Sequence, residues 1–222
     1  GNPAFAAPAP NTTTADVVAG TGAKLFVGLG MQGFLQKKVV ATGGTASQVD
    51  VLLYGGSRTI GGVKVAVVGT VHNNNLGANF LSDATHAAAL AADGLSAYVG
   101  PTHGYILQFT NGLKVYLSGD TGHTSDMKLI VRDFYKANLA VLNIGNIFTM
   151  GPEEAAFAAN KLIKPKSVIA SHANEEATSG GVVIAGTKTD QFSKLVKVPV
   201  HVPTSGDVME FNGNGKCVAG AC

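Results

Sequence analysis

Residues 113–123 place the strongest constraint on how this chain can fold. An apolar segment over Leu113–Leu117 has the composition of a buried β-strand, and it runs directly into an aspartate, Asp120, framed by Gly119 and Gly122. No basic side chain adjoins Asp120 to neutralise its carboxylate, so a metal ion fits this position. The alternative is an Asx-turn, in which Asp120 accepts hydrogen bonds from local amides.

The composition indicates a globular protein with few surface charges. The 222 residues are 45% apolar and 14% charged, with a formal net charge of +2, so we expect a single domain over residues 1–222. No apolar run reaches the roughly 18 residues that a membrane helix needs. The sequence contains no run of basic residues, so nothing in it indicates a nucleic-acid or membrane-surface partner.

Strand-like and helix-like segments alternate along the chain, which predicts a layered α/β fold. The strongest local signals are Asn111-Gly112, a hairpin turn, and Pro152 followed by Glu153, a helix start. Residues 1–14 read as an irregular arm, residues 73–104 as a long loop and residues 212–222 as a tail. Predicted strands span 24–28, 49–54, 63–71, 105–109, 113–117, 139–144, 167–170, 200–202 and 208–211. Predicted helices cover a short segment from Thr13 or Thr14 to 18, then 31–38, a segment capped by Ser125 or Asp126, 155–163 and 189–196.

Four candidate site residues follow predicted strands. Asp120 follows one strand, Asn143 and Gly145 end another, and His172 follows a third. Ligands bind at this edge in layered α/β folds, so we expect these residues to share one location.

The histidines divide into three groups. His72 and His172 each close an apolar strand; a lone histidine there is more often structural, but two beside Asp120 suit zinc, manganese or iron. His123, three residues beyond Asp120, and His103, before the hairpin, are weaker candidates for contact with a substrate or with the metal ligands. His86 and His201 read as surface or structural residues.

Cys217 and Cys222 are the two cysteines. With no adjacent histidine they fall short of a zinc site, and a small disulfide closing the C-terminal segment fits better. A disulfide would imply an oxidising compartment, hence a periplasmic or secreted protein. Two free thiols are the alternative.

Several motifs together resemble the metallo-β-lactamase superfamily, in particular its ascorbate-phosphate-lactonase-like hydrolases. They are the strand-end His72, Gly-Tyr-Ile-Leu-Gln-Phe before the hairpin, Val-Tyr-Leu-Ser-Gly-Asp120-Thr-Gly, Phe148-Thr-Met-Gly-Pro-Glu-Glu-Ala-Ala156 and Lys166-Ser-Val-Ile-Ala-Ser-His172. The resemblance covers residues 15–211 and implies an αβ/βα sandwich with a metal site at one edge.

The resemblance also implies a site and a reaction. His72 would ligate a first metal ion, Asp120 would bridge two divalent ions, most simply zinc, and His172 would ligate the second. A metal-activated hydroxide would then attack a lactone, which we place first, or a similar ester, amide or phosphate ester. Asn143, Gly145, His123 and His103 would contact the substrate or support the ligands.

One expected motif is absent from the printed sequence. The family's His-x-His-x-Asp-His ligand cluster is not found around any of the six histidines. We therefore expect the N-terminal strands of the sandwich to be supplied by a companion fragment that carries these ligands. The alternative is a non-catalytic binding or assembly module on a metal-depleted fold.

Overall fold

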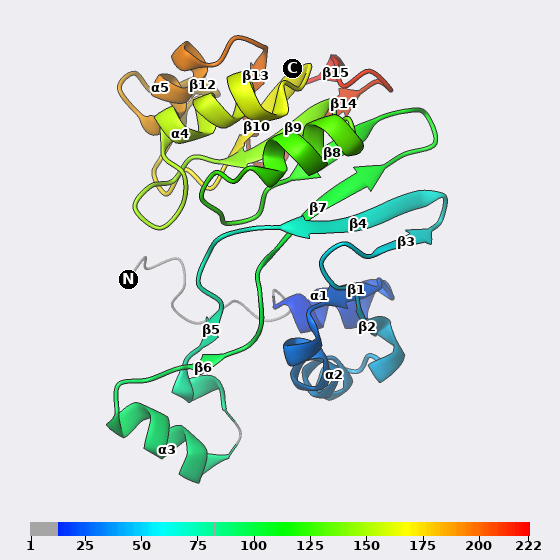
Figure 1. Ribbon diagram of the computed structural model, residues 1–222, viewed down its shortest axis with the longest axis vertical. Coiled ribbons are helices and arrows are strands. Elements are labelled where there is room, and N and C mark those ends of the chain that lie inside the picture. Colours follow the sequence, from blue (N-terminus) through cyan, green and yellow to red (C-terminus); the bar gives the residue numbers. More distant parts are fainter. Residues whose placement is uncertain (1–12, 82) are drawn as a thin grey trace. The chain divides into compact units, whose positions relative to one another are not determined.

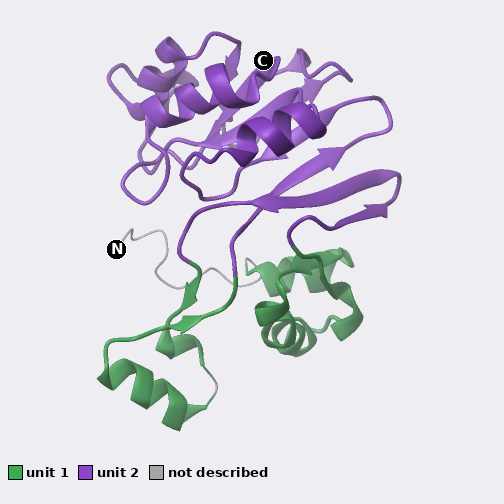
Figure 2. Cartoon of the chain, in the orientation of Figure 1, with its two compact units in different colours: residues 1–53, 74–100 green, residues 54–73, 101–222 purple. Residues whose placement is uncertain are grey.

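The computed structural model describes residues 13–81 and 83–222. The chain divides into two compact units (Figure 2), one of Gly1–Leu53 and Asn74–Gly100, the other of Tyr54–Asn73 and Pro101–Cys222. That the whole chain forms one domain stays a prediction.

A seven-stranded sheet forms the centre of the second unit (Figure 1). Its first four strands run parallel to their neighbours and its last three are antiparallel. The parallel half follows from the alternation of strands and helices, and the antiparallel half from tight turns, among them the predicted hairpin at Asn111-Gly112. In spatial order the strands are β13 Val200–His201, β10 Ser167–Ser171, β9 Leu139–Asn143, β8 Lys114–Leu117, β7 His103–Gln108, β4 Val63–Gly69 and β3 Ser57–Ile60.

Four helical segments pack on one face of this sheet. Buried side chains of the strands, such as Ile106 and Leu142, form one cluster with helical residues such as Val131, Ile163 and Phe192. This cluster is the core of the second unit. The segments are the π-helices η5 Met127–Phe134 and η6 Ala158–Ile163, and the α-helices α4 Pro152–Phe157 and α5 Lys188–Leu195.

A row of apolar side chains crosses the other face of the sheet. Tyr105 pairs with Leu117, Leu117 with Val141, and Val141 with Ile169, so the four residues lie side by side on neighbouring strands. All four are half-buried, whereas the residues that alternate with them are buried. The sheet is therefore apolar on both faces.

The first unit has a smaller core of its own. Helices α1 Thr14–Thr21 and α2 Gln32–Ala41 pack with the parallel strands β1 Leu25–Val27 and β2 Val49–Val51. Short 3₁₀ turns, η2 Leu29–Met31 and η3 Ala46–Gln48, connect them.

The prediction of a long loop over residues 73–104 is wrong. The segment contains strands β5 Asn75–Leu76 and β6 Ala97–Tyr98, the 3₁₀ turn η4 Ala78–Phe80 and the helix α3 Ala84–Ala92. The Asp83 side chain accepts a hydrogen bond from the His86 amide and so caps α3. Alanine, the best helix former, fills most of this helix, which has no buried residue and hence no apolar face to detect.

Two other predicted helix starts have mixed outcomes. Thr13 caps α1 in a capping box with Asp16, so residues 13–14 are not part of an irregular arm; residues 1–12 lie outside the described residues. Neither Ser125 nor Asp126 caps η5 with its side chain. The Asp126 carboxylate instead accepts a hydrogen bond from the Tyr54 hydroxyl at 2.8 Å.

The C-terminal residues are more ordered than the predicted tail. Strand β15 Cys217–Gly220 pairs antiparallel with β14 Met209–Phe211. Cys217 and Cys222 form a disulfide, as the sequence predicts. A further pair of strands, β11 Thr178–Ser179 and β12 Val182–Val183, lies between β10 and α5 in the chain.

Candidate functional site

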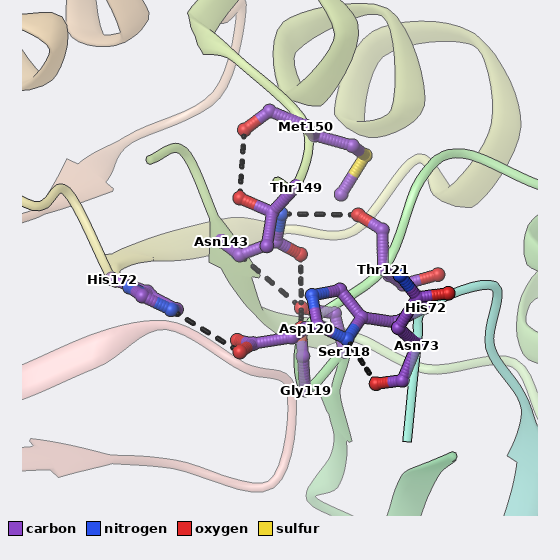
Figure 3. Close-up of polar contacts among 10 residues, drawn as sticks. All are labelled: His72, Asn73, Ser118, Gly119, Asp120, Thr121, Asn143, Thr149, Met150 and His172. Atoms are coloured by element: carbon purple, nitrogen blue, oxygen red, sulfur yellow. Dashed lines mark hydrogen bonds and ion pairs between the residues drawn. The ribbon is translucent and has the colours of Figure 1, made fainter. Parts of the chain in front are cut away.

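Asp120 and His172 meet beyond the ends of two strands of the central sheet. Asp120 follows β8 and His172 follows β10, with β9 between them. The His172 Nε2 lies 3.2 Å from the Asp120 Oδ2 (Figure 3). The two side chains are 35% and 43% exposed, so solvent reaches the pair.

Gly145, beyond the end of β9, lies against the backbone of His172. A Cβ atom at Gly145 would come within 2.4 Å of the His172 carbonyl oxygen and 2.9 Å of the Asn174 Nδ2. His172 itself has a left-handed backbone with a φ of 49°, which is uncommon outside glycine. Only glycine therefore fits at position 145 while His172 keeps this conformation.

Asn143, the last residue of β9, holds the segment that carries Asp120. Its Nδ2 donates to the Thr121 carbonyl at 3.1 Å, and its Oδ1 lies 3.1 Å from the Ser118 hydroxyl. Its backbone N–H also points to the Ser118 Oγ at 3.3 Å. All three residues are buried. Asn143 thus stabilises the segment that carries Asp120, and its buried side chain is not exposed for contact with a substrate.

Ser118 and Thr121 are site residues that sequence reasoning missed. They are the polar residues on either side of the Gly119-Asp120 turn, and this placement is the signal that could have identified them. Thr121 also accepts a hydrogen bond from the Val71 amide at 2.9 Å, and Val71 accepts one from the Gly122 amide at 3.1 Å.

These contacts bring the segment before His72 alongside the segment after Asp120. The His72 Nδ1 lies 2.7 Å from the Asn73 carbonyl oxygen (Figure 3), an arrangement that leaves Nε2 as the nitrogen with a free lone pair. Among the described residues, no hydrogen bond joins His72 to Asp120 or His172. The structure therefore places His72 on the loop beside the segment that follows Asp120, but not in hydrogen-bond contact with Asp120 or His172.

His123 and His103 make no polar contact with the pair. His123 is exposed, and its ring centroid lies 5.9 Å from that of Phe157 on α4. His103 begins β7 and is half-buried, and its buried Nε2 has no hydrogen-bond partner among the residues that the structure describes. Burial lowers the pKa of the His103 imidazole.

The remaining two histidines are where the sequence predicts. His86 is exposed on α3. His201 is buried on β13, with its Nδ1 3.0 Å from the Cys222 carbonyl oxygen.

The donor chemistry of the pair fits a divalent transition metal, but the set of donors is incomplete. One carboxylate and one imidazole suit zinc, manganese or iron, and three or four ligands are usual. Within residues 13–81 and 83–222, no group of three histidine, cysteine, aspartate or glutamate side chains is placed to hold a metal ion. No helix in the same residues is long and apolar enough to cross a bilayer.

Relatives of known sequence agree with this picture. A UPF0173 metal-dependent hydrolase of Heliobacterium modesticaldum is 30% identical over 206 residues, which cover 90% of this chain and 75% of that protein. A UPF0173 metal-dependent hydrolase of Polynucleobacter asymbioticus is 36% identical over 122 residues, 54% of this chain and 41% of the relative. The matched part thus spans less than half of the second relative.

The fold has relatives among solved structures as well. Igni18, a metallo hydrolase from the archaeon Ignicoccus hospitalis KIN4/I, superposes with a TM-score of 0.59 at 23% identity and covers 91% of this chain and 71% of that one. The beta-lactamase superfamily domain matches residues 15–173. The predicted metallo-β-lactamase fold is confirmed, and the chain belongs to the beta-lactamase superfamily domain family, among the UPF0173 metal-dependent hydrolases.

Proposed function

We propose that this protein is a metal-dependent hydrolase that opens a lactone or a similar ester or amide. The observation that carries the proposal is the convergence of Asp120 and His172, 3.2 Å apart, at a solvent-accessible edge of the sheet. The buried hydrogen bonds among Asn143, Ser118 and Thr121 hold the Asp120 segment in place, as expected for a site that keeps its geometry without substrate.

In this proposal His72, Asp120 and His172 bind divalent metal ions, two in number and most simply zinc, with manganese or iron as alternatives. A bound metal would polarise the scissile carbonyl and lower the pKa of a water molecule. The chain's own residues do the positioning. Asn143 holds the Asp120 segment, Gly145 allows His172 its backbone conformation, and Asn73 orients the His72 ring.

His123 and His103 have a lesser part in the proposal. They would contact substrate at the mouth of the site, but neither makes a polar contact with Asp120 or His172 in the described residues.

Three donors do not complete a two-metal site, so further ligands are needed. A companion fragment that supplies them stays a prediction, which the comparisons do not support. Intact-mass spectrometry of the natively purified protein tests it, because a second polypeptide carrying the missing histidine motif would appear as a separate mass.

A non-catalytic binding or assembly module is the second candidate. It is favoured by one observation, namely that the described residues contain no group of three metal-binding side chains. Such a module would have kept the sheet and helices and lost the metal.

Metal analysis of the same sample separates the two candidates. About two metal ions per molecule, with lactone hydrolysis that a chelator abolishes and zinc or manganese restores, would support the hydrolase. Fewer than about one ion per molecule, with no hydrolysis after metal is added back, would support the module.

We also propose that the protein works in an oxidising compartment, either periplasmic or secreted. The disulfide between Cys217 and Cys222 supports this placement, since such bonds rarely persist in a reducing cytosol. Fractionation of the source cells with thiol trapping tests the proposal. Recovery in the cytosolic fraction with both thiols free would overturn it.

A further inference from the structure

Two loops are anchored to the residue that follows Asp120. Thr121 is fully buried. Its hydroxyl accepts a hydrogen bond from the Val71 amide at 2.9 Å, and its carbonyl accepts one from the Met150 amide at 3.1 Å. The segment before His72 and the turn before α4 are therefore fixed to the same point.

The turn over residues 146–150 is held at both ends. The Asn146 amide donates to the Met150 carbonyl at 3.2 Å, and the Met150 side chain is buried (Figure 3 shows Met150 beside Thr121). Before the turn, Gly145 lies against the His172 carbonyl. Each end of the turn thus contacts a segment that carries a candidate metal ligand.

Between these anchors the turn presents two large apolar side chains to solvent. Ile147 is 85% exposed and Phe148 is 78% exposed, and Val71, in the segment before His72 that is also anchored to Thr121, is 66% exposed. We call these three residues the apolar lip. Exposed apolar side chains are common singly, but three on two loops fixed beside one candidate site suggest a binding role.

The absence of charged residues in the two segments that carry the apolar lip indicates which chemical groups it would bind. Residues 145–151 contain no charged side chain, and neither do residues 69–71. The lip therefore offers contact area to a neutral apolar group and no partner for an ionic one.

We propose that the apolar lip binds an alkyl or aryl group next to the scissile bond of the substrate. This inference rests on the proposed hydrolase function and specifies its substrate class: lactones or esters with an apolar side group, preferred over the unsubstituted ring. The apolar lip would contribute to substrate binding only, and Asp120, His72 and His172 keep their proposed role as metal ligands.

A series of γ-lactones with 5-alkyl chains from methyl to hexyl tests the inference on the full metal-loaded protein. We expect kcat/KM to rise about tenfold or more along the series, since burial of each methylene is favourable by up to about 0.8 kcal/mol. In the double variant I147S/F148S the ratio of kcat/KM for the hexyl lactone to kcat/KM for the methyl lactone should fall close to one. Leu129→Ser, an exposed apolar residue on η5, is the matched control and should keep the wild-type ratio.

A binding series makes failure of the inference distinguishable from failure of the proposed function. The matching 5-alkyl pyrrolidinones are the amide counterparts, and calorimetry can measure their affinity without turnover. Affinity that rises with chain length and loses this rise in I147S/F148S would support the lip even if no lactone were hydrolysed. That result would overturn only the proposed lactone hydrolysis.

Two outcomes would overturn the lip. One is lactone hydrolysis in which neither rate nor affinity depends on chain length. The other is a wild-type protein that is oligomeric by light scattering and becomes monomeric in I147S/F148S, with a flat chain-length series, which would assign the three side chains to an interface between copies of the chain.

Discussion

The Asp120 Oδ2 and the His172 Nε2 lie 3.2 Å apart although 52 residues separate them in the chain. They meet because β8, β9 and β10 run parallel, so their carboxyl ends reach the same edge of the sheet. The end of β9, the middle strand, contacts both flanking segments: Asn143 is hydrogen-bonded to the segment that carries Asp120, and Gly145 lies against the backbone of His172. The geometry of the pair is therefore set by the end of β9.

Asp120→Ala should remove hydrolysis and lower the affinity for zinc by at least about tenfold, because it deletes a charged donor. The fold should persist, since the side chain is 43% exposed and contributes little packing. Activity assays, zinc titration and circular dichroism on the same preparation check both parts. His86→Ala, an exposed residue of α3, is the control and should match wild type. Wild-type activity in folded Asp120→Ala would refute the assigned role.

Gly145→Ala should weaken metal binding and activity without unfolding the protein. The new Cβ would lie 2.4 Å from the His172 carbonyl oxygen, so the backbone of His172 must shift, and its side chain, which faces Asp120, shifts with it. Because a displacement of about 1 Å can cost a hundredfold in rate, we expect a loss of that order. Zinc titration alongside kcat/KM is the measurement.

The matched control for this variant is Gly33→Ala. Gly33 lies in α2, where a Cβ would meet no atom of residues 13–81 or 83–222 within 4 Å. This change should therefore leave activity unaltered and raise stability by about 0.5–1 kcal/mol. Equal zinc affinity in the Gly145→Ala and Gly33→Ala proteins would contradict the positioning role of Gly145.

Asn143→Ala should destabilise the fold by about 1–3 kcal/mol, because it removes the two buried hydrogen bonds that the Asn143 amide makes with the Ser118 hydroxyl and the Thr121 carbonyl. Urea unfolding gives the free energy of unfolding. Zinc affinity should also fall, since the Asp120 segment loses its support. Asn214→Ala, at an exposed position near β15, should change neither quantity by much. A variant at Asn143 as stable as wild type would show that the network is dispensable.

Much of the sheet could be predicted because its signals are local or periodic. The hairpin at Asn111-Gly112 and the start of α4 at Pro152 follow from backbone preferences that hold in any context. Helix α3 could not be predicted from periodicity, because it buries no side chain. Strand β3 was missed because all four residues are exposed and only its pairing with β4 makes it a strand.

The candidate site shows the same division. Asp120 and His172 could be predicted to meet, since strand ends of a parallel sheet share an edge. For Ser118 and Thr121 the sequence signal, their place beside the Gly119-Asp120 turn, is weak because serine and threonine are common in turns. Their tertiary contacts with Asn143 and Val71 are what mark them as part of the site. His72 was expected as a ligand beside Asp120; the described residues place it on the adjoining loop, and its role as a ligand stays a prediction.

Replacing both cysteines in C217S/C222S should lower the free energy of unfolding by about 2 kcal/mol. The bond closes a loop with a sequence separation of only 5 residues, so its entropic effect is at the small end for disulfides. Urea unfolding of the double variant and of reduced wild type should give the same loss. Activity should be unchanged, because the disulfide is not part of the Asp120 network. Identical stability of oxidised and reduced wild type would contradict this prediction.

Acidic pH should destabilise the protein partly through His103. Burial lowers the pKa of this imidazole in the folded state, whereas in the unfolded chain it returns to about 6.5. Above that value both states hold the neutral ring and the full stability is present. As the pH falls below it, the unfolded chain binds the proton first, so the free energy of unfolding decreases until the folded state is protonated too.

His103→Gln removes this titrating group and should flatten the pH dependence of the free energy of unfolding between about pH 7.5 and 5.5, while stability near pH 8 stays close to wild type. Urea unfolding at each pH gives the two curves, and parallel curves for wild type and variant would show that the His103 ring stays accessible to protons in the folded state.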